Sequence, residues 1–209
     1  FRTYIEFFEW RSKIYLSIPE LLKLCNEYSI EPSILWNVFI NNSVKQGHLL
    51  NADALYDVLK RYSLAKRDYL WTTFINGRNS DDDRIVQLIE IYNKGEVLEV
   101  SDKEQIRLLL ILFSWVLTSS NRWLRDTTSK AMIEILKDHF AYTEYLLKLF
   151  SDVNDPYVIQ RLYGIVFGAC VKRNYENKET FKSLVCFVFD GIFNKDTIYP
   201  DILLRDYAR

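Results

Sequence analysis

Apolar side chains recur every three or four positions along most of this chain. This spacing places them on one face of a helix. With six glycines and no Asn-Gly or Asp-Gly hairpin signal, a large antiparallel sheet is not expected. The pattern therefore predicts an all-α fold. The expected helices cover about residues 3–15, 17–28, 32–47, 51–62, 66–76, 80–95, 101–117, 121–138, 142–150, 156–169 and 181–193.

Two of these segments depart from a simple two-sided pattern. Residues 108–117 are apolar almost all round, so this helix is expected to be buried on several sides. Residues 181–193 are rich in Phe and Val, which also suits a strand. Their length and their helical neighbours favour a buried helix instead.

Residues at the expected helix starts support these boundaries. Ser17 and Glu20 have the spacing of a capping box, Asn51 is a good N-cap, and Ser101 is expected to open the helix over residues 101–117. Proline suits the first turn of a helix because that position needs no N–H donor. The prolines that stand at such positions are Pro19, Pro32, Pro156 and Pro200.

The chain divides near its middle. Residues 94–101 have no strong period, and the helices after them are longer and more regular. We therefore predict a less regular helical bundle over residues 1–97 and stacked antiparallel helix pairs over residues 98–209. The alternative is that this segment is a plain loop within one continuous domain.

Composition narrows the class of protein. Of 209 residues, 49% are hydrophobic and 26% are charged, which is ordinary for a globular chain. The formal net charge of −1 gives no overall electrostatic case for nucleic acid or an anionic membrane. The longest strongly apolar run is too short to span a bilayer. The odd set of Cys25, Cys170 and Cys186 predicts buried thiols in a reducing compartment such as the cytoplasm.

The segments around Trp123-Leu124 and Tyr157-Val158 lie 34 residues apart, and each follows a polar turn that contains Asn. This arrangement indicates a repeated helix pair that buries its open face against the next pair. The second unit resembles the HEAT-type repeat, in which an Asp and an Arg six positions later form a ladder between repeats. Asp155 and Arg161 have this spacing, whereas Asn121 and Thr127 stand at the matching places of the first unit.

A longer stretch carries a more specific resemblance. Residues 117–126 read Leu-Thr-Ser-Ser-Asn-Arg-Trp-Leu-Arg-Asp, and residues 153–158 read Val-Asn-Asp-Pro-Tyr-Val. Together with residues 161–164, they resemble a segment of the large bacterial STAND or NACHT-like NTPases of antiphage defence. The resemblance covers about 55 residues and implies a helical sensor of a protein trigger, with an ATPase module elsewhere in a longer parent. The chain has no Gly-x-x-x-x-Gly-Lys motif, so no nucleotide is expected to bind through a P-loop here.

The charged residues at the start of the helix over residues 121–138 are candidates for partner binding. They are Arg122, Arg125 and Asp126. Arginines at a helix start suit a carboxylate or phosphate on a partner. The alternative is structural: Asn121, Asp155 and Arg161 are expected to cap helices and brace successive repeats. Gly164 and Gly168 are expected to mark a close contact between helices.

The sequence shows no catalytic or metal-binding pattern. His48 and His139 are separate from each other and from the cysteines, so neither a metal site nor a bound cofactor is expected in this chain. The first methionine is Met132, and we expect the chain to be a fragment of a longer protein.

The sequence therefore favours a non-enzymatic scaffold or sensor that recognises a protein, either a phage or host trigger or another domain of its parent. Two alternatives remain open. One is a nucleic-acid-binding module that uses the basic and aromatic segment Lys60–Arg78. The other is a free-standing helical enzyme with a deep polar pocket between its two halves that contains a histidine with a shifted pKa.

Overall fold

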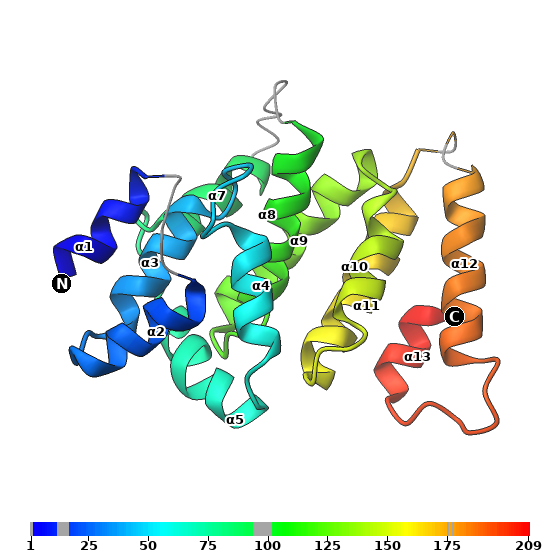
Figure 1. Ribbon diagram of the computed structural model, residues 1–209. Helices are drawn as coiled ribbons and strands as arrows, with labels where there is room; N and C mark the ends of the chain where they lie inside the picture. Colours follow the sequence, from blue (N-terminus) through cyan, green and yellow to red (C-terminus); the bar gives the residue numbers. More distant parts are fainter. Residues whose placement is uncertain (1, 12–16, 94–101, 175, 177) are drawn as a thin grey trace.

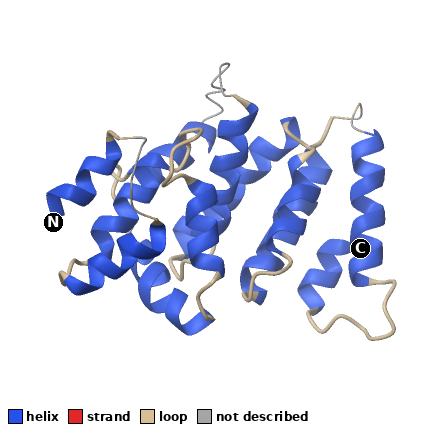
Figure 2. Cartoon of the chain, viewed as in Figure 1, coloured by secondary structure: helices blue, strands red, loops and turns tan. Residues whose placement is uncertain are grey.

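The computed structural model describes residues 2–11, 17–93, 102–174, 176 and 178–209. Every regular element in these residues is a helix, and they contain no strand (Figure 2). The all-α prediction is confirmed. None of the described helices has the length and the apolar character that crossing a bilayer requires.

The first part of the chain forms short helices. They are α1 (Arg2–Glu6), α2 (Ile18–Glu27), α3 (Pro32–Asn42), α4 (Ala52–Lys60), α5 (Leu64–Arg67), α6 (Thr73–Asn76) and α7 (Arg84–Asn93). Longer helices follow. They are α8 (Lys103–Val116), α9 (Arg122–Asp138), α10 (Tyr142–Phe150), α11 (Pro156–Lys172), α12 (Lys178–Ile192) and the short α13 (Ile202–Ala208). Helices α8, α9, α11 and α12 follow one another across the molecule, away from its N-terminal end (Figure 1).

The helices pack in two rows. In one row α7 packs on α9, α9 on α11, and α11 on α13. In the other row α4 packs on α8, α8 on α10, and α10 on α12. The rows meet where α8 contacts α9, α10 contacts α11 and α12 contacts α13. Each helix after α8 therefore rests both on its neighbour in the chain and on the helix two places before it.

One hydrophobic core runs through both parts of the chain. Trp115 on α8 packs against both Tyr56 of α4 and Phe150 of α10, with ring centroids 6.0 and 5.2 Å away, and these two rings also contact each other. The apolar stretch of α8 is buried on all sides, as its sequence predicts. The predicted boundary at residues 97 and 98 lies outside the described residues, and the row that contains α9 and α11 already begins with α7.

Local signals placed most helix starts correctly. The Glu20 carboxylate accepts a hydrogen bond from the Ser17 backbone N–H at 2.7 Å, and Asn51 caps α4 through the N–H groups of Asp53 and Ala54. The cap of α8 was predicted wrongly: Asp102 is the N-cap and accepts from the Glu104 N–H. Ser101 lies outside the described residues. Aspartate fills this role as well as serine does.

The helix predicted over residues 66–76 contains a π-helical turn, Asp68–Thr72. The Thr73 N–H donates to the Asp68 carbonyl, five residues back, and the Thr73 hydroxyl donates to the same oxygen at 3.1 Å. The extra residue in this turn helps to place Trp71 in the core, while Tyr69 remains 77% exposed.

The C-terminal helix pair differs from its prediction. Residues 181–192 are helical, as expected, but α12 is not buried, because Val185 and Phe189 are about half exposed. The prediction of three buried thiols was also wrong, since Cys186 on this helix is exposed and Cys170 is partly so. Sequence spacing identifies an apolar face, but it does not show whether another helix covers it.

Candidate partner-binding surface

The segments that begin α9 and α11 lie on the same edge of the molecule, because these helices run in parallel. Three contacts between them keep one register: Asp126 with Arg161, Glu134 with Lys172, and Gly168 beside Ile133. Contacts join Arg122, Arg125, Asp126, Tyr157 and Arg161 on this edge, and Trp123 follows Arg122 in the first turn of α9. We call these six residues the helix-start surface.

Local chemistry fixes both helix starts. The Asn121 side chain accepts from the Leu124 N–H at 3.3 Å, and the Asp155 side chain accepts from the Val158 N–H at 3.2 Å. The turn before α9 is held by Asn76 of α6, whose side-chain oxygen accepts from the Ser119 hydroxyl and the Ser120 N–H. Asn121 thus caps α9, and the turn that contains it is held in place by Asn76 from the first part of the chain.

Asp126 is the meeting point of two arginines. Arg122 of the same helix lies 3.3 Å from its carboxylate, and Arg161 of α11 lies 3.5 Å from it. The Arg122 side chain is 87% exposed, so its pairing contributes little to stability. Arg161 therefore has its charged partner in the preceding helix of the row.

Tyr157 stands between two guanidinium groups. Its ring centroid lies 5.5 Å from Arg125 and 5.4 Å from Arg161, and its hydroxyl accepts from the Arg161 Nε at 3.0 Å. Arg125 also donates to the Ser119 carbonyl at 2.8 Å. These contacts hold the two guanidinium groups in place beside an exposed aromatic ring.

The helix-start surface is positively charged overall, because three arginines face one aspartate. The N-terminal ends of α9 and α11 add positive potential at the same edge. Trp123 and Tyr157 are 47% and 39% exposed, and exposed aromatic residues beside arginine are typical of protein interfaces. The sequence indicated the three charged candidates on α9, but it did not indicate that Arg161 and the Tyr157 ring would join them.

Asp155 lies away from this surface and is buried. Its second carboxylate oxygen is 3.3 Å from Arg67, whose side chain is fully buried and also donates to the Asn154 carbonyl. The Arg67 guanidinium lies 5.4 Å from the Trp115 ring. Burial raises the pKa of the Asp155 carboxyl, although Arg67 and the Val158 N–H favour its charged form. The charged partner of Asp155 is therefore in α5, in the first part of the chain.

The segment Lys60–Arg78 does not present one continuous basic surface. Arg67 is buried, Lys60 lies 3.8 Å from Asp152, and Arg78 pairs with Asp83 at 3.0 Å. Of its aromatic side chains, Trp71 is fully buried and Tyr69 is 77% exposed. The π-helical turn thus places the side chains of Tyr69 and Trp71, which are two residues apart, in different surroundings.

The described histidines do not meet one another or a metal-binding group. His48 is buried, its Nε2 lies 3.0 Å from the Phe8 carbonyl, and its Nδ1 accepts from the Leu50 N–H. Burial lowers the pKa of His48, which suits a neutral structural role. Within the described residues, no group of three or more His, Cys, Asp or Glu side chains is placed to hold a metal.

The hollow between α7 and α9, where the two halves meet, has a volume of about 330 Å³. Its lining contains no histidine. The residues that line it are Tyr92, Asn93, Lys130, Ile133, Glu134 and Lys172.

No family model, no curated protein and no solved structure matches this chain. The contacts of the chain itself therefore carry the functional argument.

Carboxylates also tie successive helices together in both rows. Glu134 of α9 pairs with Lys137 and with Lys172 of α11. Glu144 of α10 pairs with Lys148 and accepts from the Ser183 hydroxyl of α12. These partners lower the pKa of both carboxyls below the ordinary 4.5. The charged forms therefore stabilise the folded chain.

This stabilisation is present above pH 4.5 and is lost as the pH falls through the lowered folded-state pKa values. We expect the free energy of unfolding to fall more steeply on acidification in the wild type than in a Glu134→Gln/Glu144→Gln variant. Denaturant unfolding from pH 6 to pH 3 measures the difference. Asp196→Asn, in an exposed loop, is the matched control. Equal slopes for the wild type and the double variant would show that these pairs do not stabilise the fold.

Proposed function

We propose that this chain is a non-enzymatic scaffold that binds an acidic surface of a protein partner through its helix-start surface. The observation that carries the proposal is the combination of Arg122, Arg125 and Arg161 with the exposed rings of Trp123 and Tyr157. Arginine next to exposed aromatic residues supplies both charge and contact area at an interface. Arg125 and Arg161 are held by contacts with Ser119, Asp126 and Tyr157, so these two side chains need little ordering on binding.

The two rows of helices support a HEAT-like assignment, because each helix pair covers the open face of the one before it. Gly164 and Gly168 add to this support. A Cβ at Gly168 would lie 2.7 Å from the Ile133 side chain, and one at Gly164 would lie 3.2 Å from the Tyr207 ring. These glycines allow α11 to approach α9 and α13 closely.

The resemblance to STAND-type NTPases suggests the wider setting. In that setting the segment belongs to a larger ATP-dependent bacterial defence protein in the cytoplasm, and its partner is a phage or host trigger or another domain of the parent. Partner binding would shift the packing between successive helix pairs. The pairs at Asp126–Arg161 and Glu134–Lys172 are the contacts that such a shift would change first.

The test uses the parent protein in bacterial cells challenged with phage. We expect Arg122→Glu combined with Trp123→Ala to reduce protection by at least about tenfold in plaque counts, since removal of interface anchors typically has effects of this size. A photo-reactive residue at position 123 in the otherwise native protein is expected to cross-link to the partner. Lys182→Glu, an equal charge change at an exposed site on α12, is the control.

Full protection by the double variant, at normal protein levels, would rule out this surface as the recognition site. Protection that survives deletion of residues 102–209 would rule out a sensing role for the whole segment.

A further inference from the structure

The Asp126 carboxylate is the one acidic group of the helix-start surface, and it pairs with two of the three arginines. Its Oδ2 atom lies 3.3 Å from the Arg122 Nε, and its Oδ1 atom lies 3.5 Å from an Arg161 guanidinium nitrogen. The Asp126 side chain is 40% exposed, so a partner that covers this edge meets it directly. A carboxylate on the partner would therefore approach two arginines that already have an acidic neighbour.

Both of these ion pairs are of a kind that a partner can replace. The Arg122 side chain is 87% exposed and the Arg161 side chain is 32% exposed, and ion pairs near solvent contribute little to stability. The separations of 3.3 and 3.5 Å also exceed the length of a strong hydrogen bond between two charged groups, which is about 2.7–2.9 Å. A partner carboxylate with better geometry can therefore take the place of Asp126.

Arg125 differs from the other two arginines of the surface. Its guanidinium donates to the Ser119 carbonyl and lies 5.5 Å from the Tyr157 ring centroid. In the part of the chain that the structure describes, it makes no ion pair, and its Nε is buried without a hydrogen-bond partner. A first partner carboxylate can thus pair with Arg125, whereas a second one has to displace Asp126.

Arg161 has an anchor that does not involve Asp126. Its Nε donates to the Tyr157 hydroxyl at 3.0 Å, and its guanidinium lies 5.4 Å from the centroid of the same ring. Both residues belong to α11, so these contacts form within one helix. The charge of Asp126 can therefore be removed while Arg161 keeps a fixed position for a partner.

We propose that Asp126 determines which acidic partners the helix-start surface accepts, because its charge offsets one partner carboxylate. This inference rests on the proposed function, since it concerns the same surface and the same acidic partner. A single carboxylate can pair with Arg125 but is repelled by Asp126, and like charges brought together weaken an interface. A partner with two neighbouring carboxylates gains a second pair with an arginine that Asp126 releases. The wild-type surface thus selects partners with at least two neighbouring carboxylates.

Two peptides of about 12 residues test the proposal in NMR titrations of the isotope-labelled 209-residue chain. They share a serine and leucine background with neutral ends, and they carry either one glutamate or two adjacent glutamates. Backbone amide shifts at the starts of α9 and α11 report binding at the helix-start surface, including binding at millimolar concentrations. We expect the wild type to bind the two-glutamate peptide at least about fivefold more tightly than the one-glutamate peptide.

The decisive variant is Asp126→Asn, which keeps the shape of the side chain and removes its charge. We expect this variant to bind the one-glutamate peptide about fivefold more tightly than the wild type does, the size of one good surface ion pair. One carboxylate on the partner then suffices. A merely structural role for Asp126 gives the opposite result, because loss of its contacts with Arg122 and Arg161 would leave binding unchanged or weaken it.

Asp138→Asn is the matched control, because it removes the same charge from the other end of the same helix, about 18 Å from Asp126. Asp138 is exposed. This control variant is expected to bind the one-glutamate peptide like the wild type. Equal tightening in both variants would mean that the overall charge of the chain controls binding, and the proposal would fail.

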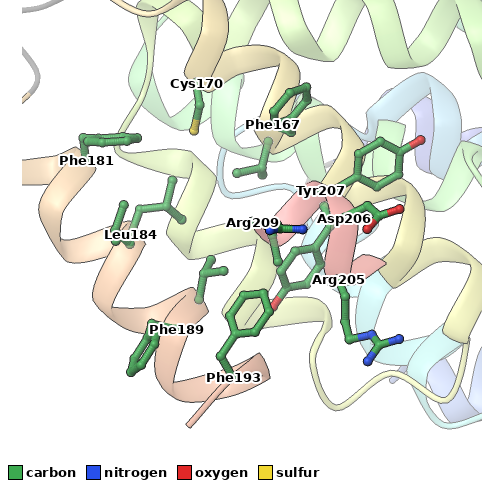
Figure 3. Close-up of a pocket in the computed structure, with 15 residues that line it drawn as sticks. Phe167, Cys170, Phe181, Leu184, Phe189, Phe193, Arg205, Asp206, Tyr207 and Arg209 are labelled. Carbon is green, nitrogen blue, oxygen red and sulfur yellow. The ribbon is translucent and has the colours of Figure 1, made fainter. Parts of the chain in front are cut away.

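The chain has a second basic place at which an acidic peptide could bind. Arg205 and Arg209 line a groove of about 830 Å³ between α11, α12 and α13 (Figure 3). The groove shares no residue with the helix-start surface. A peptide bound there would shift the amides of α13. Tightening by Asp126→Asn with shifts in α13 alone would overturn the proposal.

Failure of this proposal is distinguishable from failure of the proposed function. If neither peptide shifts the helix starts of the wild type or of Asp126→Asn at millimolar concentration, the surface does not bind acidic partners and both proposals fail. In the other case, the two-glutamate peptide binds there and Arg125→Ala weakens its binding, but Asp126→Asn binds no more tightly than the wild type. The proposed function then stands, and the assigned role of Asp126 is wrong.

Discussion

Replacing Arg67 with alanine is expected to lower the free energy of unfolding by about 3–5 kcal/mol, the usual cost of removing one partner of a buried ion pair. The Arg67 side chain is fully buried, and it contacts Asp155, the Asn154 carbonyl and the Trp115 ring. Its loss leaves a buried carboxylate without a cation and an empty space beside Trp115. Denaturant unfolding followed by circular dichroism measures the loss.

The pH dependence of this variant gives a second measurement. Burial already raises the pKa of Asp155, and removal of Arg67 is expected to raise it further. A raised folded-state pKa means that the stabilising form is the protonated one, so stability is lost as the pH rises through that pKa. The deficit of the Arg67→Ala variant is therefore expected to grow from pH 4 to pH 7.

Two further variants separate charge from packing. Arg61→Ala removes an exposed arginine near α5 and is expected to change stability by less than about 0.5 kcal/mol. Arg67→Met combined with Asp155→Leu replaces the pair with apolar side chains and is expected to recover most of the lost stability. An Arg67→Ala variant as stable as the wild type would show that this pair does not hold the two parts of the chain together.

Replacing Trp71 with alanine is expected to cost a similar amount, about 3–5 kcal/mol, because a large core side chain is removed. Trp71 is fully buried in the π-helical turn, its ring packs edge-on against Trp36 at 5.7 Å, and its indole N–H donates to the Trp115 carbonyl at 3.0 Å. It therefore joins the π-helical turn to α3 and α8. Thermal and denaturant unfolding give the size of the effect.

Two neighbouring changes serve as controls for Trp71. Trp71→Phe keeps an aromatic ring but removes one donor to the Trp115 carbonyl, which still accepts from the Thr118 hydroxyl at 2.8 Å. A smaller loss of about 1–3 kcal/mol is expected from the lost hydrogen bond and the smaller ring. Tyr69→Ala alters the same turn at a side chain that is 77% exposed and is expected to be close to neutral. A loss of stability for Tyr69→Ala as large as that for Trp71→Ala would contradict the buried position of Trp71 and the exposed position of Tyr69.

Local patterns in the sequence predicted the helices well, because short-range chemistry decides them. The inner stripes of α9 and α11 follow helical spacing and are buried as expected. The capping box at Ser17, the cap at Asn51 and the proline at the start of α11 each act within one turn. The π-helical turn was missed, since nothing in its residue spacing signals an extra residue.

The candidate site was predicted less completely. Arg122, Arg125 and Asp126 are adjacent in one helix, so their shared position could be seen in the sequence. Arg161 joins them only because α9 and α11 run in parallel and in register. Its sequence spacing from Asp155 suggested a pairing role for both residues. Their charged partners, Asp126 and Arg67, come from elements far from them in the chain.

The sequence by itself determined that this chain is all-α, where most of its helices begin, and which face of each helix is apolar. These properties follow from backbone hydrogen bonding and side-chain spacing within a few residues. Only the tertiary structure decided which apolar faces are covered, which charges are buried and which arginines meet. The half-exposed Val185 and Phe189 of α12 and the buried side chain of Arg67 are set by the positions of neighbouring helices. Contacts between distant segments leave no local pattern in the sequence, so their positions had to come from the packed fold.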